Sequence, residues 1–148
     1  SHVARAFSQR FCFELIETDA VIEREEGIPI PQIFKRFGEG YFRDKESSVI
    51  KSLQLDRPSV VSLGGGAVTR QENAAAIKES CILIYLDVPL EVCLKRAKGG
   101  GRPLLKQDAA AVAKLYEARK GIYLEACDFK LDGSRSAGEI IEDLTEII

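Results

Sequence analysis

The sequence predicts a single α/β domain over residues 1–148, with three layers and a mostly parallel sheet between helices. One observation is that short apolar runs alternate along the chain with longer segments of helical spacing. A second is the continuously apolar run 82–86, which is typical of a strand buried on both faces of a parallel sheet. A third is size, because 148 residues with 45% hydrophobic composition can bury one core.

Each element has a local signal. Val3, Phe7 and Phe11 recur with helical spacing and predict the first helix. Gly27 is expected to end the second helix, and Pro89 to open a later one. The expected strands are 13–16, 60–63, 82–86 and 129–131. The expected helices are 3–11, 20–26, a helical turn through 33–37, 39–53, 72–78, 89–95, 109–126 and 137–147.

Composition excludes several classes of protein. The net charge of −2 argues against a general nucleic-acid-binding protein. No run of about 18 apolar residues is present, so we expect no membrane partner. The four cysteines form no CxxC pair, which favours reduced, buried thiols in the cytoplasm over a metal site or a disulfide framework. We expect a monomer.

The apolar run 60–63 ends in Gly64, Gly65 and Gly66. In open α/β sheets, ligands bind beyond the carboxyl ends of strands. Glycines at such an end let the backbone approach a ligand with no Cβ in the way, and expose N–H groups to anionic or hydroxylated atoms. The alternative is a tight turn between strand and helix with no further role.

Charged residues fall where helices should present their core faces. Glu46 lies on the apolar stripe of the helix 39–53, three residues after Arg43, so it can hold the guanidinium in a fixed direction. A surface ion pair is the alternative. Arg119 falls among Val112, Leu115, Tyr116, Ile122 and Tyr123, which mark a buried face. A buried arginine needs an anionic partner, either a protein carboxylate or a bound carboxylate or phosphate.

Two further groups complete the candidate site. Glu17 and Asp19 follow a strand, and one carboxylate can help to hold a hydrated Mg²⁺ while the other takes up a substrate hydroxyl. The alternative for Asp19 is a helix cap. A basic segment from Lys95 to Lys106, rich in glycine, is a candidate anion clamp that includes Arg96 and Arg102.

Taken in order, these residues resemble the shikimate kinase family over nearly the whole chain, from residue 1 to about 131. Each motif is modest alone, but the ordered set is specific. The residues that carry the resemblance are Glu17-Thr18-Asp19, Ile22-Glu23, Ile33-Phe34, Gly38-Glu39, Phe42-Arg43, Glu46, Leu63-Gly64-Gly65-Gly66-Ala67-Val68, Arg102-Pro103-Leu104-Leu105, and Arg119 with Tyr123.

The resemblance implies a nucleoside-monophosphate-kinase-like P-loop fold and transfer of the ATP γ-phosphoryl group to the 3-hydroxyl of shikimate, with Mg²⁺. It implies that Asp19 binds ring hydroxyls and acts as base or orienter. A lid at about 98–108 and a shikimate-binding helical region at about 20–54 are implied as well. The other implied shikimate contacts are Arg43 and Arg119 on the carboxylate, Gly64, Gly65 and Gly66 lining the pocket, Glu46 holding Arg43, and Phe34 and Phe42 as an apolar wall. On the nucleotide side, Arg102 would reach the transferring phosphate and Arg96 would lie near the adenine.

The chain departs from the family's pattern in two places. Glu17 stands where the family usually has Asp, so its contact with metal-bound water is expected to shift. The phosphate-binding loop G-x-x-x-x-G-K-[ST] and the strand before it are not part of this sequence. Counted back from Asp19, Ser1 falls at the loop's last residue, the Mg²⁺ ligand, and we expect the natural protein to carry the loop. Without it, the chain should bind shikimate and transfer phosphate poorly.

Two other functions stay open at this point. A related small-molecule kinase, such as one acting on gluconate, is one of them. Asp19, Arg43 and Arg119 instead favour a cyclic carboxylate with vicinal hydroxyls, and a substrate panel would decide. The other is a non-catalytic, shikimate-kinase-like binding protein, which a natural gene without the phosphate loop would favour.

Overall fold

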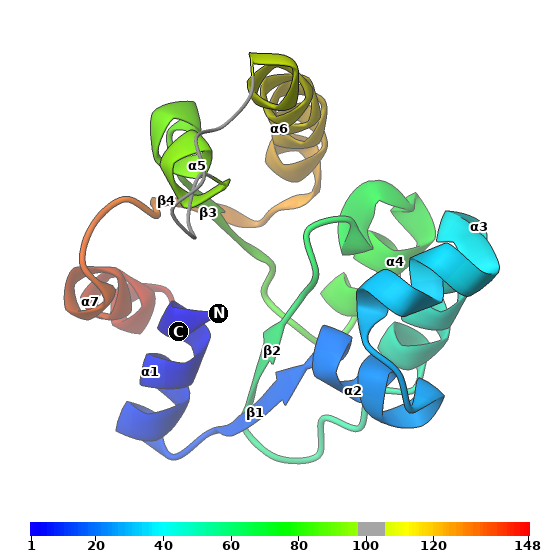
Figure 1. Ribbon diagram of the computed structural model, residues 1–148. Coiled ribbons are helices and arrows are strands. Elements are labelled where there is room, and N and C mark those ends of the chain that lie inside the picture. The colour runs from blue at the N-terminus through cyan, green and yellow to red at the C-terminus, as the bar shows by residue number, and fades with distance from the viewer. Residues whose placement is uncertain (98–105) are drawn as a thin grey trace. The chain divides into compact units, whose positions relative to one another are not determined.

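The computed structural model describes residues 1–97 and 106–148 (Figure 1). The described chain divides into two compact units, Ser1–Cys81 and Ile82–Ile148, and each is described here by itself.

The first unit is built on two parallel strands, β1 (Glu14–Glu17) and β2 (Ser59–Ser62). Helix α1 (His2–Phe11) packs against both strands (Figure 1). Because Glu17 pairs with Ser62, both strands end at the same edge. The segments that follow them, which begin at Thr18 and Leu63, therefore leave the sheet side by side.

Helices carry the rest of the first unit. They are α2 (Thr18–Glu26), α3 (Ile30–Lys51), the short 3-10 helix η1 (Ala67–Thr69) and α4 (Gln71–Lys78). Helix α3 is kinked at Gly38, whose φ of 85° is the left-handed conformation that glycine adopts easily. Ile22, Ile33, Phe42 and Val49 form the apolar cluster that joins α2 to α3.

The second unit has its own parallel pair, β3 (Ile84–Asp87) with β4 (Phe129–Asp132). Its helices are α5 (Leu90–Ala97), α6 (Lys106–Ala126) and α7 (Ala137–Ile147). Helix α5 packs on α6, and α7 packs on β4. The alternation of strands and helices and the parallel pairing predicted from the sequence are confirmed.

Several predicted boundaries are wrong. The strand expected over 82–86 begins at Ile84, and only Tyr85 in it is buried, because β3 pairs with β4 alone among the described strands. Ile82 is 52% exposed. Helix α2 begins at Thr18, so Asp19 lies in its first turn and is not its cap. Helix α6 begins at Lys106 within the expected lid, whose residues 98–105 lie outside the described residues.

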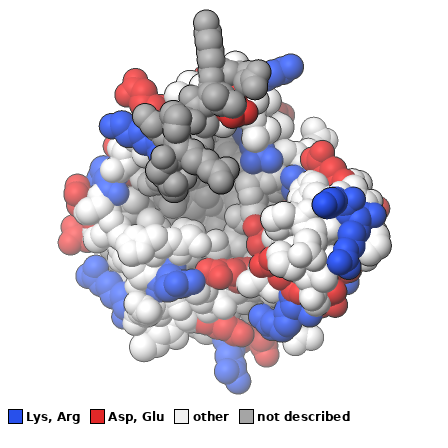
Figure 2. Space-filling view, in the orientation of Figure 1, with Lys and Arg blue, Asp and Glu red and all other residues white. Residues whose placement is uncertain are grey.

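The surface features agree only in part with the sequence predictions. All four cysteines are free, but none is buried, and Cys12 is exposed in the left-handed turn that ends α1. Figure 2 shows Lys and Arg interspersed with Asp and Glu on the face that it draws. Within 1–97 and 106–148, no helix has the length and apolar character needed to cross a membrane.

Candidate active site

The glycine turn after β2 is where the first unit brings its predicted site residues together. A Cβ added to Gly64 would lie 2.6 Å from Asp19 Oδ1. A Cβ added to Gly66 would overlap the guanidinium of Arg43. The turn therefore has glycine at these positions because two charged side chains of opposite sign fill the space beside its backbone.

Thr18 fixes this turn to the end of β1, and the sequence analysis missed it. Its side chain is fully buried. Its hydroxyl donates to the Ser62 carbonyl at 3.3 Å and accepts from the Gly64 N–H at 3.4 Å. The available signal was its place between Glu17 and Asp19, directly after a strand.

Arg43 is held in one direction by acids of its own helix. Its Nη1 lies 2.8 Å from Glu46 Oε1, and its Nε lies 3.5 Å from Glu39 Oε1. Glu46 is fully buried, which confirms its predicted place on the core stripe and rules out an ordinary surface ion pair. Glu39, one turn earlier, carries part of the family resemblance, but its pairing with Arg43 was not predicted from the sequence.

Asp19 keeps an unused acceptor. Its Oδ1 is buried and accepts no hydrogen bond in the structure. Burial raises the pKa of Asp19, and nearby Glu23 raises it further, while Arg43 lowers it. A buried carboxylate oxygen without a donor is suited to a ligand hydroxyl, because a bound hydroxyl would replace the hydrogen bonds that burial removes.

The two aromatic residues predicted as a pocket wall differ in burial. The rings of Phe34 and Phe42 pack with centroids 4.8 Å apart. Phe42 is only 4% exposed and belongs to the apolar core, with the Arg43 guanidinium 5.1 Å from its ring centroid. Phe34 is half-buried, so it offers more accessible apolar surface than Phe42.

Ser1 and Glu17 lie together at the edge where the strands end. The nitrogen of Ser1 is 3.6 Å from Glu17 Oε1 and 3.3 Å from Ser62 Oγ. Among residues 1–97 and 106–148, no cluster of three His, Cys, Asp or Glu forms a metal site. A hydroxyl and a carboxylate nevertheless fit Mg²⁺, which prefers oxygen ligands and commonly keeps waters and phosphate oxygens as its other ligands.

The remaining predicted residues fall outside this cluster. Arg119 lies half-buried on α6 in the second unit, and it forms no ion pair with any described residue. Leu115, expected on the same buried face, is 50% exposed, and the other residues of that face are only half-buried. Arg102 and the side chain of Arg96 lie outside the described residues.

Comparison with known proteins places this chain in one family. The family model for shikimate kinase matches residues 1–148. The chain is 40% identical over 127 residues to a shikimate kinase of Persephonella marina, covering 85% of this chain and 77% of that protein. It is 35% identical over 148 residues to a shikimate kinase of Clostridium beijerinckii, covering 100% and 87%.

A solved structure agrees with both relatives. Shikimate kinase from Acinetobacter baumannii in complex with shikimate has a TM-score of 0.88 and 28% identity, and the match covers 99% of this chain and 84% of that one. The similarity confirms the P-loop kinase α/β fold.

Proposed function

Because the chain belongs to the shikimate kinase family, we propose that Asp19 and Arg43, meeting at the glycine turn, form its shikimate site. The protein is an ATP-dependent kinase that transfers the γ-phosphoryl group to shikimate with Mg²⁺, a step of aromatic amino acid biosynthesis. The observation that carries the proposal is the placement of one carboxylate and one guanidinium in the spaces left by Gly64 and Gly66.

The two charged side chains suit the two ends of shikimate. Arg43 Nη1 donates a hydrogen bond to Glu46, and Arg43 Nε lies near Glu39. The N–H groups of Nη2 are therefore the donors proposed for the ligand carboxylate. Asp19 Oδ1 has no donor and accepts from a ring hydroxyl. That hydrogen bond orients the hydroxyl oxygen for attack on the γ-phosphorus. As the new phosphorus–oxygen bond forms, the bond from the γ-phosphorus to the β,γ-bridging oxygen breaks, ADP leaves, and Asp19 takes up the hydroxyl proton.

Residues outside the turn complete the proposed pocket. The family resemblance assigns a second carboxylate contact to Arg119 of the second unit, and its lack of an ion pair among the described residues supports that role. Phe34 and Phe42 form the apolar wall of a substrate-binding region at about 20–54, with Gly65 in the lining. The resemblance also assigns Arg102, in a lid at about 98–108, to the transferring phosphate and Arg96 to the adenine.

Ser1 and Glu17 would hold Mg²⁺ through their side-chain oxygens, since they lie together where the strands end. The bound ion neutralises charge on the phosphate oxygens. Arg5 Nη2, 3.4 Å from Glu17 Oε1, orients the carboxylate.

We also propose that the protein is a cytoplasmic monomer. The four free cysteines support the compartment, and the meeting of Asp19 and Arg43 within one chain supports the oligomeric state.

The test is shikimate affinity, measured by calorimetry on the full-length enzyme. Arg43→Lys keeps a cation for buried Glu46 but loses the planar fork that suits a carboxylate. We expect the Kd for shikimate to rise about tenfold or more, because a hydrogen bond to a charged group is worth about 1.5–3 kcal/mol. Arg43→Met with Glu46→Gln is a second variant that leaves no unpaired buried charge.

Lys45→Ala is the matched control. It removes a cation two residues away on α3, where Lys45 pairs with Glu25 at 2.9 Å and not with the glycine turn. Its Kd should stay within about twofold of the wild type. An unchanged Kd in both Arg43 variants, with both folded, would exclude Arg43 as the carboxylate ligand.

A further inference from the structure

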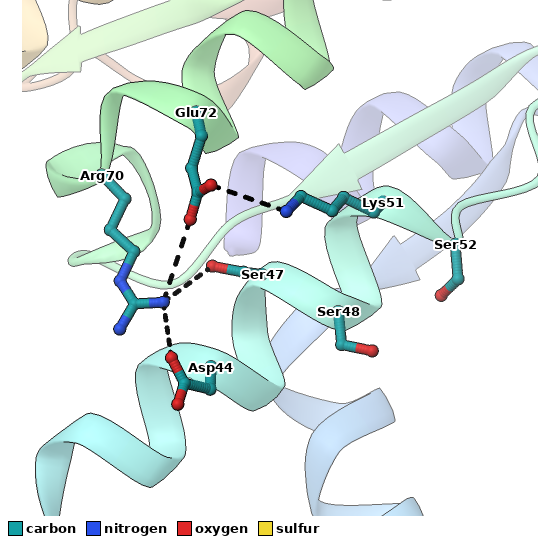
Figure 3. A pocket seen from close by; sticks show the side chains of 7 residues that line it. All are labelled: Asp44, Ser47, Ser48, Lys51, Ser52, Arg70 and Glu72. Carbon is teal, nitrogen blue, oxygen red and sulfur yellow. Dashed lines mark hydrogen bonds and ion pairs between the residues drawn. The ribbon is translucent and has the colours of Figure 1, made fainter.

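A polar pocket lies along α3 on the side of its Asp44 and Ser47, next to the turn that carries Arg43 and Glu46. It is open to solvent and has a volume of about 440 Å³. Its walls include Asp44, Ser47, Ser48 and Lys51 of α3, with Arg70 and Glu72 at the start of α4 (Figure 3). Two cations and two acids face one another across it, so its side chains largely satisfy each other.

Arg70 is the residue that joins the walls. Its Nη1 donates to Asp44 Oδ1 at 2.8 Å and to Ser47 Oγ at 3.3 Å, and it lies 4.0 Å from Glu72 Oε1. Figure 3 shows the guanidinium directed at Asp44 and Ser47, while Ser48 and Ser52 point away from it. Arg70 therefore grips one turn of α3 from the loop that precedes α4.

The same turn of α3 carries the proposed shikimate ligand. Asp44 directly follows Arg43, and Ser47 directly follows Glu46, so both i, i+3 pairs share one helical turn. The loop 66–70 meets this turn at both ends, because the Arg43 guanidinium lies against Gly66 and Arg70 holds Asp44 and Ser47.

The loop between those ends is braced from within. The Thr69 hydroxyl donates to the Gly66 carbonyl at 2.6 Å, and the buried Asn73 side chain donates to the Ala67 carbonyl at 2.8 Å. A shift of Arg70 relative to α3 therefore also moves Gly66, against which the Arg43 guanidinium lies, relative to the helix that carries Arg43.

We propose that Arg70 is a positioning residue that holds α3 at the distance from the glycine turn at which Arg43 binds the shikimate carboxylate. The inference rests on the proposed function. Asp44 is 76% exposed, so the ion pair contributes little to folding. Its contribution is to geometry, and a displacement of about 1 Å at a binding group is enough to lower affinity strongly.

The pocket supplies a control for this clamp. Lys51 also joins α3 to α4, with its Nζ 3.6 Å from Glu72 Oε2, and both side chains are more than half exposed. Lys51 lies two turns along the helix from Arg43. Lys51→Ala removes an ion pair between the same helices, and it should leave the Kd for shikimate within about twofold of the wild type.

The experiment is a double-mutant cycle on the full-length enzyme, with shikimate Kd measured by calorimetry. Arg70→Ala should raise the Kd about three- to fivefold, the most that a largely exposed ion pair can contribute, and lower Tm by less than about 2 °C. In the Arg43→Lys background, Arg70→Ala should add less than about twofold, because the residue it positions is already altered. If the Kd of the double mutant rises by the product of the two single-mutant increases, the proposal is overturned.

Two outcomes separate the failure of the clamp from that of the site. If Arg43→Lys raises the Kd and Arg70→Ala does not, Arg70 is not a positioning residue, and the proposed site stands. If Arg43→Lys leaves the Kd unchanged, Arg43 does not bind the shikimate carboxylate. The proposed site is then wrong, and the positioning role of Arg70 is wrong with it. Should Arg70→Ala not fold, exposed Asp44→Ala replaces it: a raised Kd supports the clamp, and an unchanged Kd overturns it.

Discussion

Replacing Asp19 by asparagine should stabilise the protein while it nearly abolishes catalysis. The substitution keeps the size of the side chain and removes its charge. In the unliganded protein, Asp19 Oδ1 is buried without a donor, and a Cβ on Gly64 would lie 2.6 Å from it. The carboxylate is therefore held in an unfavourable place that only a ligand hydroxyl makes favourable.

The gain in stability comes from removing a buried charge, since the asparagine amide in the same place still lacks a hydrogen-bond partner. An unsatisfied buried acceptor costs about 1–3 kcal/mol, and more when it is charged. Arg43 offsets part of that cost by lowering the Asp19 pKa. A net gain of about 1 kcal/mol is expected, which raises Tm by roughly 2–4 °C for a chain of this size. Turnover should fall about 10²–10⁴-fold, the usual contribution of a general base.

The stabilisation should depend on pH with a definite sign. Burial raises the pKa of Asp19 in the folded protein, so between about 3.9 and the raised value the folded state binds more protons than the unfolded one. Wild-type stability therefore falls, relative to the variant, as pH rises through that window. The advantage of Asp19→Asn is complete above the raised pKa and disappears below about pH 3.9.

Thermal unfolding at several pH values tests the predicted gain in stability of Asp19→Asn, and steady-state kinetics test its predicted loss of turnover. Glu23→Gln is the matched control, because it removes a neighbouring acid that also raises the Asp19 pKa, while an amide oxygen can still accept from the Ile30 N–H that Glu23 binds at 3.0 Å. It should leave turnover close to that of the wild type. A Tm for Asp19→Asn below that of the wild type at pH 7, or turnover within a few-fold of it, would refute this account of Asp19.

Three other substitutions probe the remaining parts of the site. Gly66→Ala should weaken shikimate binding about tenfold and also lower Tm, because the φ of −99° at Gly66 suits alanine but the new Cβ displaces the Arg43 guanidinium, the partner of buried Glu46; calorimetry showing wild-type affinity would contradict this. Arg119→Ala should raise the Kd for shikimate, and loss of turnover alone would argue against a carboxylate contact. Arg102→Ala should lower kcat by about 10²-fold or more while shikimate Kd changes little; the reverse pattern in kinetics and binding would exclude a role on the transferring phosphate.

Local patterns were enough to predict the α/β alternation and half of the site. Glu46 lies on an apolar stripe at a spacing of three from Arg43, and both facts can be read along one helix. Asp19 and the three glycines follow strands, so their meeting at one sheet edge follows from parallel pairing. The family resemblance added the substrate, which spacing alone does not give.

Contacts between distant segments could not be read in the same way. Arg70 meets Asp44 across 26 positions, and Thr18 meets Ser62 across 44. Hydrophobic periodicity carries no information on such polar pairs, because they depend on how the elements pack. The start of α2 was misplaced for a related reason, since Thr18 uses its hydroxyl on the glycine turn and not as a helix cap.

The measurement that tests the central claim most directly is a crystal structure of the full-length enzyme with shikimate. The account predicts the carboxylate of shikimate on the Arg43 guanidinium and a ring hydroxyl within hydrogen-bond distance of Asp19 Oδ1, beside Gly64 and Gly66. Shikimate bound elsewhere, for example in the pocket between Asp44 and Arg70, with the Asp19 carboxylate still lacking a donor, would contradict it.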